Sequence, residues 1–330
     1  MFSIDLYEGN ATARTITTNI DVSNNGGLVW IKARNSSEQE HNLYDTVRGA
    51  GERLISHATS TESTETQTLK SFTSSGFTLG TSNMANQNGK DFVAWTWRKH
   101  PKFFDVVTYT GTGSAQAIAH NLGSVPGMII TKSTSVAYNW GVFHRSLGNT
   151  KALILDATNA EDTGSSYWNN TDPTSTHFTV GSDNTTNASD GGTYVAYLFA
   201  HNNSDGGFGE PEDQDIIKCG TFTNSGSGIE VDLGFEPQFM MFKRTDATSN
   251  WGVVDVMRSS PRPVTSAGDN SNQLRWNLRN SENAEYHPFP TPTGFKAVGA
   301  AGGGGGGSGT FVYMAIRRGG MQTPTTASDV

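Results

Sequence analysis

The sequence has little charge, almost no cysteine and no long apolar run. Only 16% of the 330 residues are charged, and Cys219, the one cysteine, has no partner for an intramolecular disulfide or a cysteine-based zinc site. No apolar run approaches the ~18 residues of a membrane-spanning helix. The first ten residues lack the basic start and apolar core of a secretory signal. We therefore expect a chain without a membrane span, made in a cytosol.

The charge that is present does not suit nucleic acid. The formal net charge is −8, and lysine and arginine are scattered along the chain. A protein that binds phosphate backbones carries a basic stripe or patch. We therefore expect no nucleic-acid partner.

In place of charge, the sequence is rich in Ser, Thr, Asn and Gly. Short β-branched or aromatic runs recur about every ten residues, with turn residues between them, which is typical of sandwiches and small barrels. Only residues 62–72 show even a partial helical pattern. The predicted fold class is all-β.

Six landmarks recur along the chain in one order, which indicates three copies of one unit. An apolar segment ending in lysine marks each copy, at Lys32, Lys132 and Lys243. The other landmarks are Asn139–Val142 with Asn250–Val253, Leu54–Glu62 with Leu153–Glu161, a Gly-Phe-Thr-like segment at Gly76, His177 and Gly294, and closing aromatic strands at Phe92, Tyr194 and Phe311. The third copy lacks the Leu-Ile-x-x-Ala-Thr phrase, so we expect its centre to be remodelled.

The repeats predict three tandem β-sandwich-like units of about 100 residues. Their predicted boundaries are 1–100, 101–204 and 205–319, followed by an extended tail over 320–330. Each unit is large enough to bury a core of its own, so we expect a row of independent sandwiches.

No constellation typical of catalysis appears. The eight histidines lack metal-ligand spacing, and His100, His120 and His201 are interpreted as surface-loop residues. Most acidic residues lie in turns and linkers, whereas glycoside cleavage needs a close carboxyl pair. We predict a non-enzymatic protein without cofactor or metal. One alternative stays open: the loop from Asp183 to Asp190 is either a calcium site or an ordinary Asx-turn.

Tryptophan provides the candidate recognition residues. Four of the seven lie in repeat landmarks and are expected in the core: Trp30, Trp95, Trp140 and Trp251. Trp168, between Tyr167 and Asn169, and Trp276 lie instead in the variable middle of their units. They are either buried or exposed in loops that recognise a sugar or a protein.

The run Gly302–Gly307 is a further candidate. It lies between two predicted strands of the third copy, so it is neither a phosphate-binding turn before a helix nor a linker. We interpret it as a surface loop, with Gly304 and Gly305 as candidate receptor contacts.

Several phrases resemble a repeat family of bacteriophage tail proteins, the large tail and fibre proteins of marine phages such as those of cyanobacteria. The phrases are Asn10–Arg34, Asp45–Ala50, His100–Val107, His120–Gly127 and the closing Arg317-Arg318-Gly319. The resemblance covers nearly the whole chain and implies a virion component at or near the host-contacting tail. It implies no catalytic residues.

The resemblance leads to a functional expectation: a tail fibre or adhesin that contacts host-surface glycan or lipopolysaccharide. Its expected partners are two further copies in a homotrimer and other tail proteins of the virion, after synthesis in the host bacterial cytoplasm. Two alternatives stay open. One is a structural tail or capsid decoration protein without receptor contact, and the other is a tailspike that degrades polysaccharide.

Overall fold

The computed structural model describes residues 1–209, 214–258, 272–284, 287–297 and 308–319. The described chain consists of strands in antiparallel sheets, with three helices of four residues each. Helices of this length could not span a bilayer, and the described residues contain no longer one. The prediction of an all-β protein is confirmed.

One strand order occurs three times, in three six-stranded sheets. In spatial order, the first sheet contains β1 (Phe2–Glu8), β9 (Asp91–Arg98), β3 (Gly27–Ala33), β4 (Asn42–Asp45), β5 (Glu52–Ile55) and β6 (Ser63–Thr64). The second contains β10 (Phe104–Thr110), β17 (Thr193–Ala200), β12 (Pro126–Ser133), β13 (Gly141–His144), β14 (Lys151–Ile154) and β15 (Asp162–Thr163). The third contains β18 (Ile217–Asn224), β26 (Gly309–Arg317), β20 (Pro237–Arg244), β21 (Trp251–Asp255), β22 (Asn272–Arg275) and β23 (Asn283–Ala284).

A smaller sheet accompanies each large one. These sheets are β2 (Arg14–Thr17), β8 (Gly76–Leu79) and β7 (Leu69–Thr73); β11 (Gln116–Ala119) and β16 (His177–Val180); and β19 (Ile229–Asp232), β25 (Gly294–Ala297) and β24 (Phe289–Thr291). The helices are α1 (Asn83–Asn86), α2 (Ser165–Trp168) and α3 (Asn184–Asn187). We call the parts that carry β1–β9, β10–β17 and β18–β26 the first, second and third lobes.

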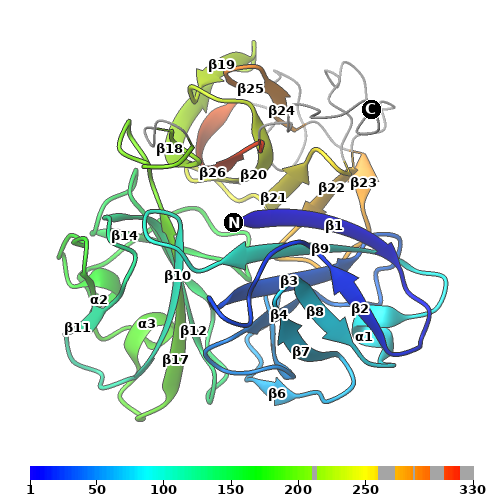
Figure 1. The fold of residues 1–330 in the computed structure, drawn as a ribbon. Helices are drawn as coiled ribbons and strands as arrows, with labels where there is room; N and C mark the ends of the chain where they lie inside the picture. The colour runs from blue at the N-terminus through cyan, green and yellow to red at the C-terminus, as the bar shows by residue number, and fades with distance from the viewer. Residues whose placement is uncertain (210–213, 259–271, 285–286, 298–307, 320–330) are drawn as a thin grey trace.

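The three lobes surround a common centre (Figure 1). One apolar core contains buried residues of all three, including Trp30, Tyr197 and Met314. The expected row of independent sandwiches is therefore wrong: each large sheet packs against the other lobes as well as against its own small sheet. The first interface joins the first and second lobes, the second joins the second and third, and the third joins the third and first.

Strand β9 shows how a large sheet serves two cores. Alternate residues of a strand point to opposite faces. Trp95 and Trp97 belong to the central core, whereas Phe92 and Ala94 pack in the core that the first lobe forms with its small sheet. Both faces are apolar, so the strand is buried over most of its length.

Equivalent backbone hydrogen bonds join the lobes at all three interfaces. The amide of Glu62 donates to the carbonyl of Thr134, that of Glu161 to Thr245, and that of Glu282 to Arg34, at 2.7–2.8 Å. The last of these bonds returns from the third lobe to the first. The lobes therefore form a closed ring.

Buried polar side chains meet across the same interfaces. Tyr197 donates from its hydroxyl to Asp45 at the first interface, and Trp95 donates from Nε1 to Asp255 at the third, both at 2.9 Å. At the second interface Met314 occupies the position of these donors, as the strand pairing shows. There His144 replaces the aspartate, and its Nε2 lies 3.1 Å from the carbonyl of Tyr313. An aspartate is thus present at the two interfaces where the facing strand supplies a side-chain hydrogen-bond donor.

The repeated lysines contribute to two interfaces. Lys132 donates from Nζ to the carbonyl of Thr59 at 3.0 Å, and Lys243 donates to Thr158 at 3.1 Å, in each case across to the preceding lobe. Within the described part of the chain, Lys32 donates to two carbonyls of its own lobe, those of Ala33 and Ser36. The third copy lacks the Ala-Thr phrase that supplies the carbonyls at the other two interfaces.

Candidate functional site

The two candidate recognition tryptophans are buried. Trp276 is 0% exposed and stacks on Trp30 with ring centroids 4.2 Å apart, which helps to close the third interface. Trp168 is 1% exposed, packs edge-on against Phe143 and donates from Nε1 to the carbonyl of Lys151 at 3.1 Å. Their proposed exposure in receptor-binding loops is therefore wrong. The alternative of core packing is confirmed, as it is for Trp30, Trp95, Trp140 and Trp251.

The neighbours of Trp168 divide between core and surface. Tyr167 is buried beside it, and its hydroxyl donates to Asp162 at 2.6 Å. Burial and this carboxylate both raise the pKa of the Tyr167 phenol. Asn169 ends α2 in the left-handed conformation, at φ 52°, and is exposed. Of these three candidates, Asn169 alone lies at the surface.

The glycine candidates Gly304 and Gly305 lie outside the described residues. The flanking segments are strands β25 and β26 of the third lobe, as the repeat predicted.

The metal alternative for the loop from Asp183 to Asp190 is not supported. Asp183 accepts from the amide of Thr185 at 2.8 Å and caps α3, whereas Asp190 accepts from the hydroxyl of Tyr138. The described ranges contain no group of three or more His, Cys, Asp or Glu side chains placed to hold a metal. Of the histidines expected at the surface, His120 is buried.

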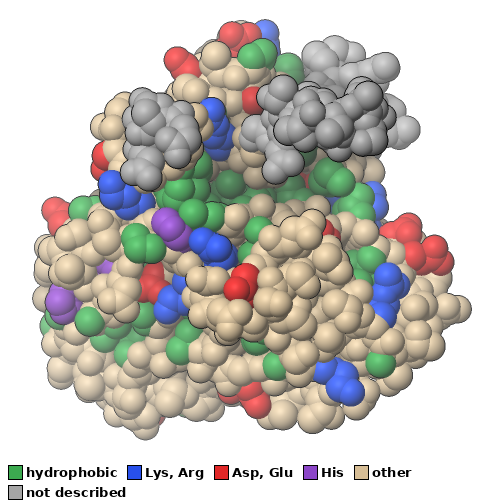
Figure 2. Space-filling model, viewed as in Figure 1, with side chains coloured by type: hydrophobic (Ala, Val, Ile, Leu, Met, Phe, Trp, Pro, Cys, Tyr) green, Lys and Arg blue, Asp and Glu red, His purple; other side chains and the backbone are tan. Residues whose placement is uncertain are grey.

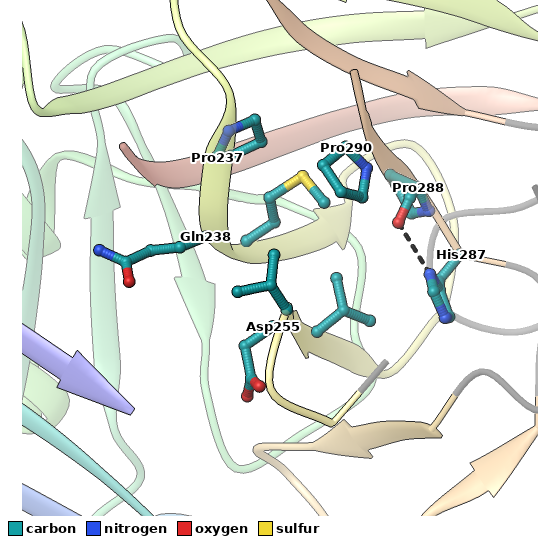
Figure 3. Close-up of a pocket in the computed structure, with 9 residues that line it drawn as sticks. Pro237, Gln238, Asp255, His287, Pro288 and Pro290 are labelled. Carbon is teal, nitrogen blue, oxygen red and sulfur yellow. Dashed lines mark hydrogen bonds between the residues drawn. The ribbon is translucent and has the colours of Figure 1, made fainter. Parts of the chain in front are cut away.

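One pocket lies in the third lobe, between β20, β21 and the segment leading into β24 (Figure 3). Pro237, Pro288 and Pro290 line it together with aliphatic side chains, and the ring of His287 points towards the carbonyl of Pro288, 2.7 Å from its Nδ1. Its volume is about 10 Å³, the room of one water molecule. It is therefore too small for a ligand.

A larger hollow lies where the lobes meet. Met1, Phe103 and Ile216, which precede the first strand of each large sheet, all line it, and Arg317 and Arg318 contribute polar atoms. Hydrophobic side chains gather where the lobes meet, below the lobe at the top of Figure 2. The hollow has a volume of about 220 Å³, enough for a side chain of another protein.

A groove of about 400 Å³ lies at the first interface. Its lining residues are Val47, Arg48, Glu52 and Glu62 of the first lobe and Thr108, Thr134, Thr193 and Tyr194 of the second. Thr108 and Thr193 of the second lobe are exposed, and so is the apolar side chain of Val47 in the first lobe. The groove combines hydroxyls, two carboxylates and a small apolar surface, and it is the candidate functional site.

Arg48 orders one wall of the groove. Its Nε lies 2.6 Å from Asp45 and its Nη1 lies 2.7 Å from Glu62, and Nη1 also donates to the carbonyl of Glu52. Burial alone would lower the pKa of this guanidinium, but Asp45, Tyr197 and Glu62 together raise it above its ordinary value. Arg48 therefore stays charged and holds the Glu62 carboxylate in place.

The other interfaces carry ion pairs at the corresponding positions. Strand pairing aligns Glu52 with Lys151, and Lys151 forms an ion pair with Glu161 at the second interface. At the third interface Glu282 accepts from Arg34 at 2.8 Å and from Arg258 at 3.1 Å. At the first interface Thr134 replaces the cation of Arg34, and Glu52 replaces that of Lys151. At the first interface Arg48 thus pairs with the Glu62 carboxylate, whereas the Glu52 carboxylate accepts from the hydroxyl of Thr64.

The sequence held a signal for this groove. Aligning Leu54 with Leu153, as the repeat requires, also aligns Glu52 of the first copy with Lys151 of the second. This charge reversal between two copies distinguishes the first interface from the second, and the aromatic residues of the variable segments give no sign of it.

A search of curated proteins gave no match. A protein-family model described as a domain of unknown function, DUF7483, matches residues 1–318. Because this match covers nearly the whole chain, including all three lobes and the groove, the chain belongs to the DUF7483 family.

Proposed function

We propose that the chain is a non-enzymatic component of a bacteriophage tail, part of a tail fibre or adhesin that contributes to attachment to the host surface. The phrases that resemble phage tail repeats support this proposal, and they extend over nearly the whole sequence. The family match supplies no function of its own.

The observation that carries the proposal is the closed ring of three lobes. Four buried ionisable side chains join one lobe to the next: Lys132, Lys243, Asp45 and Asp255. Side chains engaged in this way provide rigidity. A rigid body with uncharged polar loops suits a particle component that presents a fixed surface to a cell.

The ring also bears on the proposed partners. Three copies around a threefold axis, together with other tail proteins, remain our proposal for the assembly. Host-surface glycan or lipopolysaccharide is the proposed receptor. Since each chain already contains three lobes, a homotrimer would place nine lobes around its axis.

A structural tail role without receptor contact is the second candidate, and the hollow at the meeting of the lobes favours it. Phe2, Phe103 and Ile316 give this hollow an apolar lining. An apolar side chain of a neighbouring tail protein would gain free energy by entering such a hollow.

Location on the particle tests the proposal. Mass spectrometry of purified virions of the encoding phage should detect the chain, and gold-labelled antibody should place it at the host-facing end of the tail. Label spread over the capsid lattice would contradict the adhesin proposal, and so would absence of the chain from purified virions.

A further inference from the structure

We propose that the groove at the first interface binds a neutral, hydroxyl-rich glycan. This inference rests on the proposed attachment function, for which it names the site and the ligand class. It concerns Val47, Glu52, Glu62, Thr108 and Thr193, none of which belongs to the recognition loops expected from the sequence.

The size of the groove suits a small ligand. Its volume of about 400 Å³ falls within the roughly 300–1,000 Å³ of small-molecule sites. The groove lies between two lobes that are fixed to each other by the bond from the Glu62 amide to Thr134 and by the bond from Tyr197 to Asp45. Its walls are therefore held in place before a ligand arrives.

The lining side chains match the chemistry of sugar hydroxyls. A carboxylate has about four lone-pair sites, and hydroxyl donors bind it by charge-assisted bonds. Glu62 accepts from Arg48, and Glu52 accepts from the hydroxyl of Thr64 at 3.1–3.2 Å, so each is oriented by a protein donor. The hydroxyls of Thr108 and Thr193 can both donate and accept. Val47, 43% exposed, offers an apolar contact for the C–H face of a sugar ring.

The charge of the groove favours a neutral glycan over an acidic one. The lining contains two carboxylates and one guanidinium. The single cation, Arg48, is already paired with Asp45 and Glu62. A uronate or phosphate group would meet like charge there.

The other two interfaces carry ion pairs at the positions that line the groove. Lys151 pairs with Glu161 at the second interface, and Arg34 pairs with Glu282 at the third. The same backbone bond joins the lobes in all three places. The first interface thus differs in its surface residues and keeps the shared backbone contact.

A matched pair of variants tests the inference. Thr108 and Thr221 are exposed and occupy the same strand position, since each pairs with the equivalent valine, Val195 or Val312. Thr108→Arg places a long cation over the groove, whereas Thr221→Arg places one at the second interface. Glu52→Lys is an independent variant that introduces the residue found at position 151.

The measurement is binding of the full-length protein to immobilised neutral oligosaccharides (dextran, mannan and chitin fragments), with alginate and polygalacturonate fragments as the acidic set. We expect the wild type and Thr221→Arg to bind at least one neutral member. Thr108→Arg and Glu52→Lys should bind it at least tenfold more weakly, with unchanged melting temperatures.

Three results would overturn the inference: no binding to any neutral member, equal binding by Thr108→Arg and the wild type, or tighter binding to the acidic set. Failure of the particle-location test would leave these binding results standing, so the two proposals fail separately. New reducing ends in a bound glycan would contradict the non-enzymatic function while leaving the groove as its site.

Discussion

At the residue scale, several buried polar side chains both satisfy a buried hydrogen-bond partner and join two lobes. Lys132 shows this most clearly. It is fully buried, and its Nζ donates to the carbonyl of Tyr138 in its own lobe and of Thr59 in the first lobe. Sequence comparison identified the repeated lysines as landmarks, but it could not show that they bond to the repeated Ala-Thr phrase, because the acceptor is a backbone carbonyl that any residue would supply.

Lys132→Met should reduce the free energy of unfolding at neutral pH by about 1.5–3 kcal/mol, because hydrogen bonds to a charged group are lost and two buried carbonyls are left without this donor. Lys70→Met is the matched control, since Lys70 is exposed on β7. The control should change stability by less than about 0.5 kcal/mol. Chemical denaturation measures both, and equal effects of the two substitutions would contradict the assigned role.

Stability should also depend on pH through Lys132. Burial lowers the pKa of this amine from 10.5 to about 8. Between these values the unfolded chain binds more protons than the folded one, so stability rises with pH. The wild type should gain about 2 kcal/mol over Lys132→Met from pH 7 to pH 10. A difference that stays constant or shrinks over this range would contradict the lowered pKa.

At the element scale, the strands that recur in each copy were predictable from the sequence, whereas the segment over residues 62–72 was not. Landmark segments at Gly76, His177 and Gly294 form β8, β16 and β25 as their periodicity indicated. The partial helical pattern over residues 62–72 contains β6 and most of β7 instead. A bulge between Leu69 and Ser71 brings Leu69 and Phe72 to one core, and their spacing of three imitates a helical face.

The polar segments before β9 and β17 each contain a helical turn with a buried asparagine. Asn187 in α3 donates to the carbonyls of Ser114 and Gly181 and accepts from the amide of Thr112 at 2.7 Å. Asn86 in α1 makes the equivalent bonds in the first lobe. One asparagine side chain thus joins its own helix to two other backbone segments by hydrogen bonds. The composition of the sequence does not reveal these bonds.

Asn187→Ala should therefore lower the free energy of unfolding by about 2–3 kcal/mol, the cost of leaving several buried backbone groups without a partner. Asn184→Ala, at an exposed position of the same helix, should cost less than about 0.5 kcal/mol. Thermal denaturation of the two variants provides the comparison. An Asn187→Ala variant as stable as Asn184→Ala would contradict the role of Asn187 in joining these backbone segments.

At the scale of the whole molecule, the repeat was visible in the sequence and the ring closure was not. Units of about 100 residues can bury a core alone, and that argument favoured a row. It failed because both faces of each large sheet are apolar, as Trp95 and Phe92 on opposite faces of β9 show. The groove depends on closure as well, because its walls come from two lobes.

The closed ring should unfold in a single cooperative transition. All three lobes share one core, so loss of one exposes apolar surface of the others. Scanning calorimetry should give a calorimetric enthalpy equal to the van't Hoff enthalpy. Two or three resolved transitions would show that the lobes are independent.

Host attachment through this chain is tested most directly by adsorption of the encoding phage to cells preincubated with purified protein. The account predicts that the wild type and Thr221→Arg reduce adsorption in proportion to their concentration, and that Thr108→Arg does so at least tenfold less effectively. Adsorption that stays unchanged at saturating wild-type protein would contradict it.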